Sequence, residues 1–381
     1  MKLKRNTRLA ALCALAVSGA LTLGACGSDD NSGSGSSTGS ATGTSASDTA
    51  ASQDIKCAGK GELRGSGSSA QKNAVDKWVN DFQAACKDVT VNYQATGSGA
   101  GIQTFLQGNT AFAGTDTALT SDEVEKSKKV CKDGQAIDLP MLGGPIAVGY
   151  NVKGVDKLVL DADTLAKIFD GRITTWNDDA IKKLNSGADL PDTKIQPISR
   201  SDESGTTDNF TKYLSAAAPD AWKYKASKKW PVEGGQSADG SSGVASQVKQ
   251  TDGAISYFEL SYATANDIKA VSLDTGASSP VEATSENATK ALAAAKVTGT
   301  GKDLSLELDY KTTAEGAYPI TLVTYEVVCD KGNKSDSLDA LKSFLTYTSS
   351  EKGQSELKNL GYAELPSDIA DKVRSTVKSL S

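Results

Sequence analysis

Three segments of the chain place glycine beside serine or threonine where a short apolar stretch gives way to a helical pattern. They are residues 65–70, 96–101 and 200–207. Backbone N–H groups at the start of a helix lack partners within the helix, and the peptide dipoles add partial positive charge there. Hydroxyl groups in these turns add further donors: Ser69, Ser98, Ser204 and Thr206. The three turns together predict an anion-binding site.

Each of these hydroxyls also has a simpler interpretation. Serine and threonine commonly cap the first turn of a helix without binding anything else, and for a single turn this explanation is sufficient. Three such turns in one chain, with Arg200 at the head of the third, favour the anion site because a guanidinium group binds oxyanions in a two-pronged manner.

The residues present exclude several other kinds of site. Residues 65–70 fit G-x-G-x-x-A, but Asn92 or Tyr93 stands where the dinucleotide fingerprint has an acidic residue. The pattern G-x-x-x-x-G-K-[ST] does not occur. The chain has no histidine, which rules out Ser-His-Asp triads and histidine-bound metals. We predict no enzyme, metal or cofactor, and a phosphatase using Ser204 or Asp116 is the alternative.

The elements that must position these turns alternate between short apolar strands and amphipathic helices, as in an α/β fold. Apolar residues recur at helical spacing over residues 70–82 and alternate over residues 89–93 as in a half-buried strand. Residues 120–123 form a capping box. Further strands are expected at 112–116, 145–150, 195–199, 253–257 and 320–328, and further helices at 102–106, 164–169, 178–184, 210–214, 338–345 and 369–377.

The N-terminal residues 1–25 have the layout of a secretory signal, with four basic residues before an apolar run at 9–23. The sequence LGAC at residues 23–26 resembles a bacterial lipobox, so we expect Cys26 to become a lipidated N-terminus. An ordinary signal followed by an incidental cysteine is the alternative. Residues 26–57 are then the lipidated cysteine and a disordered tether, because this stretch consists mainly of small and polar residues.

Four cysteines remain at or beyond the end of the tether: Cys57, Cys86, Cys131 and Cys329. An even number in an exported chain indicates two disulfides, and none of the spacings suits a metal site. Pairing the first two would close a short local loop, and pairing the last two would join distant parts of one lobe. We favour this connectivity, although the sequence permits three.

The body beyond the tether has about 325 residues, more than one hydrophobic core usually serves, so two lobes are expected. Loss of the signal takes the formal net charge from −6 to −10, which argues against nucleic acid as a partner. We expect lobe I to comprise residues 58–141 and 318–381, and lobe II residues 142–317. The chain would cross between them near Leu142 and near Tyr318, and a hinge there would close the lobes on a ligand.

Several segments resemble the periplasmic phosphate-binding proteins of high-affinity phosphate ABC transporters. The matches are residues 93–101, 112–116 and 200–207, with further similarity at 170–177 and 253–257. Similarity extends from about Gly61 to the C-terminus. This resemblance implies a two-lobed periplasmic-binding-protein-like fold of type II, with two hinge crossings, that captures inorganic phosphate between its lobes.

The resemblance also implies roles for individual residues. Ser98 would donate its hydroxyl and N–H, and Arg200 would make a bidentate contact with the ligand. The remaining donors would be Ser69, Ala70, Ser204, Gly205 and Thr206. Asp202 would pair with Arg200 and orient it, and a local turn bond to the backbone is the alternative. The first turn has GSSAQ at residues 67–71 where relatives usually have Gly-Ala-Thr-Phe-Pro, which leaves its rigidity open.

Asp116 would accept a hydrogen bond from the ligand. An ionised carboxylate repels an anion unless that anion brings a proton to share, which phosphate does near neutral pH and sulfate does not. We therefore hypothesise that Asp116 rejects sulfate, and a helix cap after the preceding strand is the alternative.

The partners that the resemblance implies are inorganic phosphate and the membrane permease subunits of a phosphate ABC importer. The protein would be a monomer held by its lipid at the extracytoplasmic face of the cell membrane. A receptor for another tetrahedral oxyanion, or a phosphate sensor, is the alternative function.

Overall fold

The computed structural model describes residues 55–381, so the predicted signal, Cys26 and nearly all of the predicted tether lie outside the described residues. The main sheet has nine strands, eight of them in the order β2-β1-β3-β13-β4-β8-β6-β7, while β9 (Lys269–Ala270) pairs with β4. The bounds of the eight are β1 Gly61–Gly67, β2 Val89–Gln94, β3 Phe112–Thr115, β4 Ala136–Asn151, β6 Gln196–Arg200, β7 Gln236–Ala238, β8 Ala254–Glu259 and β13 Thr321–Cys329.

Helices follow most of these strands, which gives the α/β pattern expected from the sequence. The helices are α2 Lys72–Ala85, α3 Ser98–Leu106, α4 Ser121–Ser127, α5 Ala162–Phe169, α6 Asp179–Leu184, α7 Gly205–Ala217, α8 Gly240–Gln250, α9 Leu260–Asn266, α10 Ser285–Leu292, α11 Leu338–Thr348, α12 Glu351–Ser355 and α13 Ser367–Lys378, with a 3₁₀ turn at Lys358–Leu360. Two small ribbons pair β5 (Val159–Asp161) with β10 (Ser272–Asp274) and β11 (Lys296–Val297) with β12 (Leu306–Glu307). Within residues 55–381, none of the helices combines the length and apolar character that a membrane span requires.

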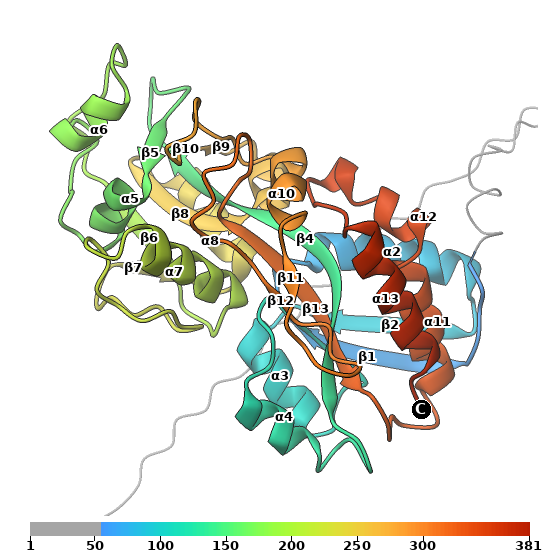
Figure 1. Cartoon of the computed structure of the whole chain (residues 1–381). Coiled ribbons are helices and arrows are strands. Elements are labelled where there is room, and N and C mark those ends of the chain that lie inside the picture. Colours follow the sequence, from blue (N-terminus) through green and yellow to red (C-terminus); the bar gives the residue numbers. More distant parts are fainter. Residues whose placement is uncertain (1–54) are drawn as a thin grey trace, which may run out of the picture. The chain divides into compact units, whose positions relative to one another are not determined.

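The long strand β4 is shared by both lobes of the fold. Its residues 136–145 pair antiparallel with β13, and its residues 146–151 pair antiparallel with β8. Figure 1 shows β4 and β13 running side by side through the middle of the sheet. The strand β13 also pairs antiparallel with β3, so it lies between β3 and β4 in the sheet.

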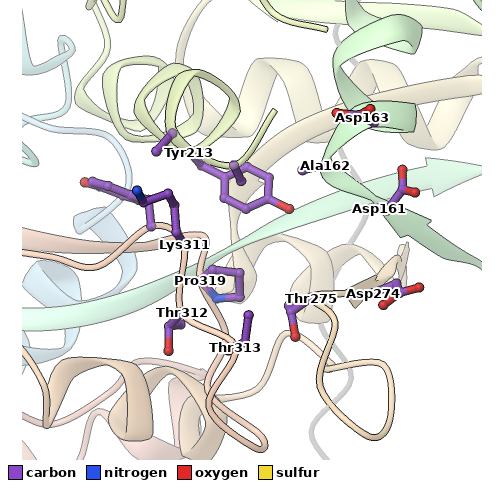
Figure 2. A pocket seen from close by; sticks show the side chains of 13 residues that line it. Asp161, Ala162, Asp163, Tyr213, Asp274, Thr275, Lys311, Thr312, Thr313 and Pro319 are labelled. Carbon is purple, nitrogen blue, oxygen red and sulfur yellow. The ribbon is translucent and has the colours of Figure 1, made fainter. Parts of the chain in front are cut away.

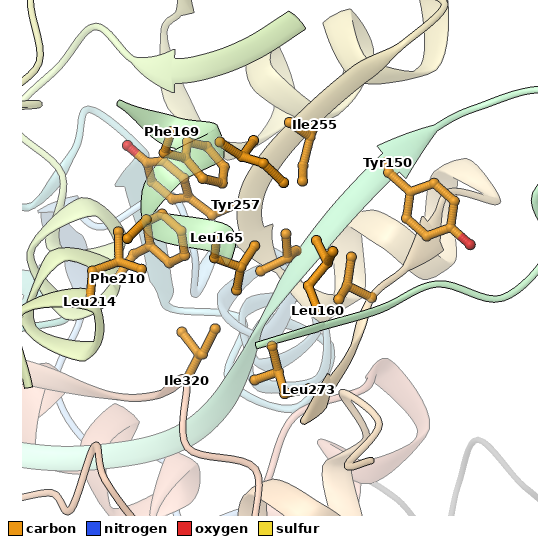
Figure 3. Packing of buried hydrophobic residues seen from close by; sticks show 14 of the residues in the cluster. Tyr150, Leu160, Leu165, Phe169, Phe210, Leu214, Ile255, Tyr257, Leu273 and Ile320 are labelled. Carbon is orange, nitrogen blue, oxygen red and sulfur yellow. The ribbon is translucent and has the colours of Figure 1, made fainter. Parts of the chain in front are cut away.

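Two large hydrophobic clusters lie against the sheet. In one, Trp78 and Phe82 of α2 pack with Phe344 of α11. In the other, Phe210 of α7 stacks on Tyr257 of β8 with ring centroids 4.4 Å apart, in the cluster shown in Figure 3. Burial of one such aromatic side chain stabilises the fold by about 1.5–3 kcal/mol, so each cluster can hold its own helices against the sheet.

The strands and helices predicted from periodicity are present, and the capping box at Thr120 and Glu123 begins α4 as expected. One boundary was wrong: β4 begins at Ala136, nine residues before the predicted strand at 145–150. Pro140, Gly143 and Gly144 interrupt the apolar pattern there and are typical of a turn. Gly143 packs closely against α10, since a Cβ at this position would lie 2.0 Å from Leu292 Cδ1 and Leu292 would have to shift.

The disulfides have the connectivity favoured from the sequence. Cys57 pairs with Cys86 after α2, and Cys131 pairs with Cys329 at the end of β13. Ile55 is buried in the lobe I cluster, so packed structure already includes residues that are predicted as tether. The second disulfide joins two segments of lobe I that are 198 residues apart in the sequence.

Candidate functional site

The predicted anion-binding turns meet where strands end and helices begin. Asp116 directly follows β3, and Ser98 is the first residue of α3. Arg200 is the last residue of β6, and Gly205 is the first residue of α7. Neighbouring strands that run parallel place their carboxyl ends at one edge, as β1 and β3 do in lobe I and β6 and β7 in lobe II. The fold therefore brings together two sets of helix N-termini from different lobes.

Asp116 lies at the centre of these turns and is 3% exposed. Its Oδ1 accepts hydrogen bonds from the hydroxyls of Ser68 (2.5 Å) and Thr324 (3.0 Å). Its Oδ2 accepts longer hydrogen bonds from Ser98 (3.4 Å) and Thr206 (3.5 Å). The cap of α4 is Thr120, so the alternative interpretation of Asp116 as a helix cap was wrong.

Burial raises the pKa of Asp116, because removal from water disfavours the charged form. The hydroxyl hydrogen bonds from Ser68 and Thr324 and the positive charge of Arg200 act in the opposite direction without cancelling this effect. The carboxylate is therefore a strong acceptor in a dry environment, held in place by donors from several segments.

Arg200 is 2% exposed and is held in a two-pronged contact by Asp202. Arg200 Nε donates to Asp202 Oδ1 over 2.7 Å, and Nη2 donates to Oδ2 over 2.5 Å. Burial alone would raise the pKa of Asp202, but hydrogen bonds from Arg200 and its charge outweigh burial and lower that pKa. Asp202 Oδ1 also accepts from Gly240 N (3.1 Å), which lies 38 residues away at the start of α8, so the predicted pairing with Arg200 is present and this backbone bond is not a local one.

The remaining guanidinium nitrogen of Arg200, Nη1, contacts a residue that was not predicted from the sequence. Arg200 Nη1 donates to the hydroxyl of Ser241, the second residue of α8, over 3.3 Å. That hydroxyl lies 3.1 Å from the hydroxyl of Ser69, and Ser241 N donates to Ser69 Oγ over 3.0 Å. The sequence DGSSG at residues 239–243 is a fourth turn of the same glycine and serine type, which is the signal that could have found it.

Direct contacts join the turns of the two lobes. Gly205 N donates to Ser98 Oγ (3.2 Å), and Gly99 N donates to the carbonyl of Glu203 (2.9 Å). A Cβ at Gly205 would lie 2.7 Å from both Asp116 Cβ and Ser98 Oγ, so only glycine permits this approach. Ser204 Oγ accepts from Thr207 N over 3.2 Å and caps α7, as the simpler interpretation of this hydroxyl expects.

The first turn accepts hydrogen bonds from three tyrosines. Tyr93 Oη donates to the carbonyl of Ser68 over 2.8 Å, and Tyr262 Oη donates to that of Ser69 over 2.6 Å. The next carbonyl, of Ala70, accepts from Tyr362 Oη over 2.7 Å. Three consecutive carbonyls are thus held, although the aromatic and proline residues usual at this turn are absent.

The assembled site offers many donors and one charged acceptor. The donors are the guanidinium of Arg200, the hydroxyls of Ser69, Ser98, Thr206 and Ser241, and backbone N–H groups at the starts of α3, α7 and α8, while Ser68 and Thr324 give their hydroxyl protons to Asp116. Within the described residues no group of three or more His, Cys, Asp or Glu side chains could hold a metal ion. This chemistry suits a small tetrahedral oxyanion that has several acceptor oxygens and a proton to donate.

Comparison with known proteins gives a consistent family. A family model described as the PBP superfamily domain matches residues 32–352. The phosphate-binding protein PstS3 of Mycobacterium bovis (strain BCG / Pasteur 1173P2) is 41% identical over 377 residues, which cover 98% of this chain and 99% of the relative. The phosphate-binding protein PstS 2 of Mycobacterium tuberculosis (strain ATCC 25618 / H37Rv) is 41% identical over 379 residues, with the same coverage of 98% and 99%.

The fold is also similar to that of solved structures. One is a putative phosphate ABC transporter substrate-binding protein from Clostridium perfringens with bound phosphate. It superposes with a TM-score of 0.59 at 22% identity, over 80% of this chain and 100% of that protein. At this identity the similarity establishes the fold, and the family assignment comes from the sequence relatives.

Proposed function

The chain belongs to the PBP superfamily and, within it, to the PstS phosphate-binding proteins, and from this premise we propose that it captures inorganic phosphate and delivers it to an ABC importer. The single observation that carries the proposal is the position of Asp116. It is a buried carboxylate in contact with hydroxyl groups and surrounded by donors from both lobes. A phosphate oxygen that carries a proton would donate to Asp116, and its other oxygens would accept from the donors.

The donors proposed to contact phosphate come from both lobes. From lobe I they are the hydroxyls of Ser69 and Ser98 with the N–H groups of Ser69 and Ala70, and from lobe II they are Arg200, Ser204, Gly205 and Thr206. To this set the hydrogen bonds of Ser241 with Arg200 and Ser69 add a further hydroxyl. Asp202 acts behind Arg200 by fixing the plane of the guanidinium.

The strongly acidic chain can bind an anion because local groups dominate inside the cleft. Charges separated by more than about 8 Å are screened at physiological ionic strength. Arg200 and the helix N-termini lie within buried surroundings, where hydrogen bonds to charged groups are strong. We infer that affinity comes from these contacts and not from the net charge of the surface.

The lobe boundaries of the proposal are residues 58–141 with 318–381 for lobe I and 142–317 for lobe II. The pairing of β4 with β13 and then with β8 supports a hinge close to Pro145 and Ile146. Closure about this hinge would bring the turn at Arg200 against the turn at Ser98. Permease subunits would recognise the closed protein.

Proteins of this family act outside the cytoplasm, and we propose that Cys26 carries a lipid that anchors the chain to the membrane. The support is the LGAC sequence before a segment of small polar residues. A Cys26→Ala variant should appear in the medium instead of the membrane fraction. Retention of this variant in the membrane fraction would contradict the proposed lipid anchor. It would leave the proposal that the protein binds phosphate unaffected.

Calorimetry tests the ligand directly. The protein without its first 26 residues is titrated with phosphate, arsenate and sulfate at neutral pH. Phosphate and arsenate should bind at one saturable site, because each carries a proton at this pH, and sulfate should bind far more weakly. Absence of heat with phosphate would overturn the proposal, and equal binding of sulfate would favour a general oxyanion receptor.

A further inference from the structure

A pocket of about 330 Å³ lies in the α5 and α7 region and contains none of the residues assigned to the anion site. Figure 2 shows it between the start of α5, the ring of Tyr213 on α7, the end of β10 and the segment at Lys311 and Pro319. Its polar groups are unlike those of the anion site, because carboxylates outnumber cationic side chains among the lining residues.

Three carboxylates line this pocket: Asp161, Asp163 and Asp274. Asp161 and Asp274 are partners in register across the parallel ribbon of β5 and β10. Like charges at such positions repel each other and destabilise the pair. Among the described residues none of the three forms a salt bridge, and Lys311, the one lysine of the lining, is likewise without one.

The carboxylates use only part of their hydrogen-bonding capacity within the protein. Asp161 Oδ1 accepts from Thr164 N over 2.7 Å and caps α5. Asp274 Oδ1 accepts from Gly276 N over 3.0 Å. The second oxygen of each carboxylate remains available to a ligand.

Tyr213 gives an independent indication that the pocket receives a ligand. Its side chain is 2% exposed, and Figure 2 shows its hydroxyl directed into the pocket toward the carboxylates. No hydrogen bond joins this hydroxyl to another group within residues 55–381. The Oγ1 of Thr275, another residue of the lining, is shielded from solvent and also lacks a partner among these residues. Buried polar groups are normally satisfied, so a shielded threonine hydroxyl and a phenol directed into the pocket, both without partners, point to a missing polar ligand.

Burial and the charges of Asp161 and Asp274 also raise the pKa of Tyr213. The phenol therefore stays neutral at physiological pH, and its oxygen can accept a hydrogen bond while its proton is directed to a carboxylate or ligand. Ala216, Ala217 and Pro319 add apolar surface to the same pocket.

We propose that this pocket binds a small organic amine through its ammonium group. The ammonium would donate to Asp161, Asp274 and the oxygen of Tyr213, and a short alkyl chain would lie against Ala216 and Ala217. A cation here would offset the repulsion between the two aspartates of the ribbon. A bare metal ion fits less well, because the carboxylates do not form a group able to hold a metal.

The test is calorimetric titration of the protein with 1,4-diaminobutane at low ionic strength, in which we expect one saturable site. Asp274→Asn should weaken binding at least about tenfold, because it removes one charge from the ammonium contact. Tyr213→Phe should weaken binding several-fold and leave the unfolding temperature unchanged or higher, since it removes a hydroxyl that has no partner.

Two control variants distinguish the pocket from general surface charge. Asp220→Asn removes a carboxylate that is fully exposed elsewhere in lobe II, and it should leave the amine affinity unchanged. Lys311→Gln removes the cation of the lining and should strengthen amine binding. The proposal is overturned if the protein shows no saturable binding, if Asp220→Asn weakens binding as much as Asp274→Asn, or if Lys311→Gln weakens it.

Discussion

The two lobes contribute different chemistry to the anion site. Lobe II supplies Arg200 and the N-terminus of α7, which carry positive charge. Lobe I supplies Asp116, which carries negative charge, together with the hydroxyls of Ser68 and Ser98 that contact it. We propose that attraction of an anion and selection among anions reside in separate lobes, so that each can be removed without the other.

The two key side chains are also held in different ways. Arg200 is held by Asp202, only two residues away in the same turn. Asp116 is held by donors from distant segments, of which Thr324 is 208 residues away in the sequence. The position of the Arg200 side chain thus depends on a neighbouring residue, whereas the position of Asp116 depends on contacts that form only when distant segments have folded together.

The largest expected effect is that of removing the charge from lobe II. Arg200→Ala should weaken phosphate binding about a thousandfold, because it removes a bidentate contact and leaves Asp202 unpaired beside the ligand. Calorimetry with phosphate measures this loss, and thermal unfolding checks that the variant folds. Affinity within tenfold of the unchanged protein would show that attraction does not reside in lobe II.

A smaller loss is expected when Arg200 keeps its charge but loses its support. Asp202→Asn should weaken phosphate binding about tenfold, since the guanidinium is no longer fixed by two charged contacts. The preference for phosphate over sulfate should remain, because selection belongs to lobe I. A variant that loses this preference would contradict the separation of the two roles.

Among these substitutions, we expect the smallest loss of phosphate affinity from one that removes the contact between Ser69, in the turn at residues 65–70, and Ser241. Ser69→Ala removes the hydroxyl that interacts with Ser241, and we expect phosphate affinity to fall about threefold. Ser246→Ala on the exposed face of α8 is a matched control that should change nothing. Equal behaviour of the two variants would mean that the Ser69 hydroxyl contributes nothing to affinity.

The selectivity that we attribute to Asp116 should depend on pH. Because the pKa of Asp116 is raised, this carboxyl begins to take up a proton at a higher pH than an exposed aspartate. A protonated Asp116 can donate to sulfate, so the preference for phosphate should decline as the pH falls from about 8 to about 5. Competition titrations across this range measure the decline, and a preference that rises toward acid pH would contradict it.

The difference between the lobes also explains what the sequence could predict. Asp202 and Arg200 are two residues apart in the sequence, and the capping box and the turns that begin α3 and α7 also involve close neighbours. These features could therefore be predicted from short stretches of sequence. Ser68, Ser241 and Thr324 were missed, because their roles depend on contacts between distant segments. Ser68 stands in a turn that the sequence analysis singled out, but only its neighbour was named.

Contacts between distant segments also limited how much of the fold could be predicted from the sequence. Strands and helices with a regular apolar period were predicted, and the disulfide connectivity was favoured correctly among three possibilities. The first part of β4 was missed because the glycine at 143 makes room for Leu292, a contact that no local pattern reveals. The tyrosines that hold the first turn, Tyr262 and Tyr362, come from sequence positions far from it.

We propose that Asp116 selects an anion that carries a proton. The most direct measurement compares the affinities of the unchanged protein and of Asp116→Asn for phosphate and for sulfate at neutral pH. We predict that the ratio of the two affinities falls at least about 100-fold in the variant, because the amide can donate to sulfate where the carboxylate cannot. An unchanged ratio in a folded Asp116→Asn protein would contradict the account.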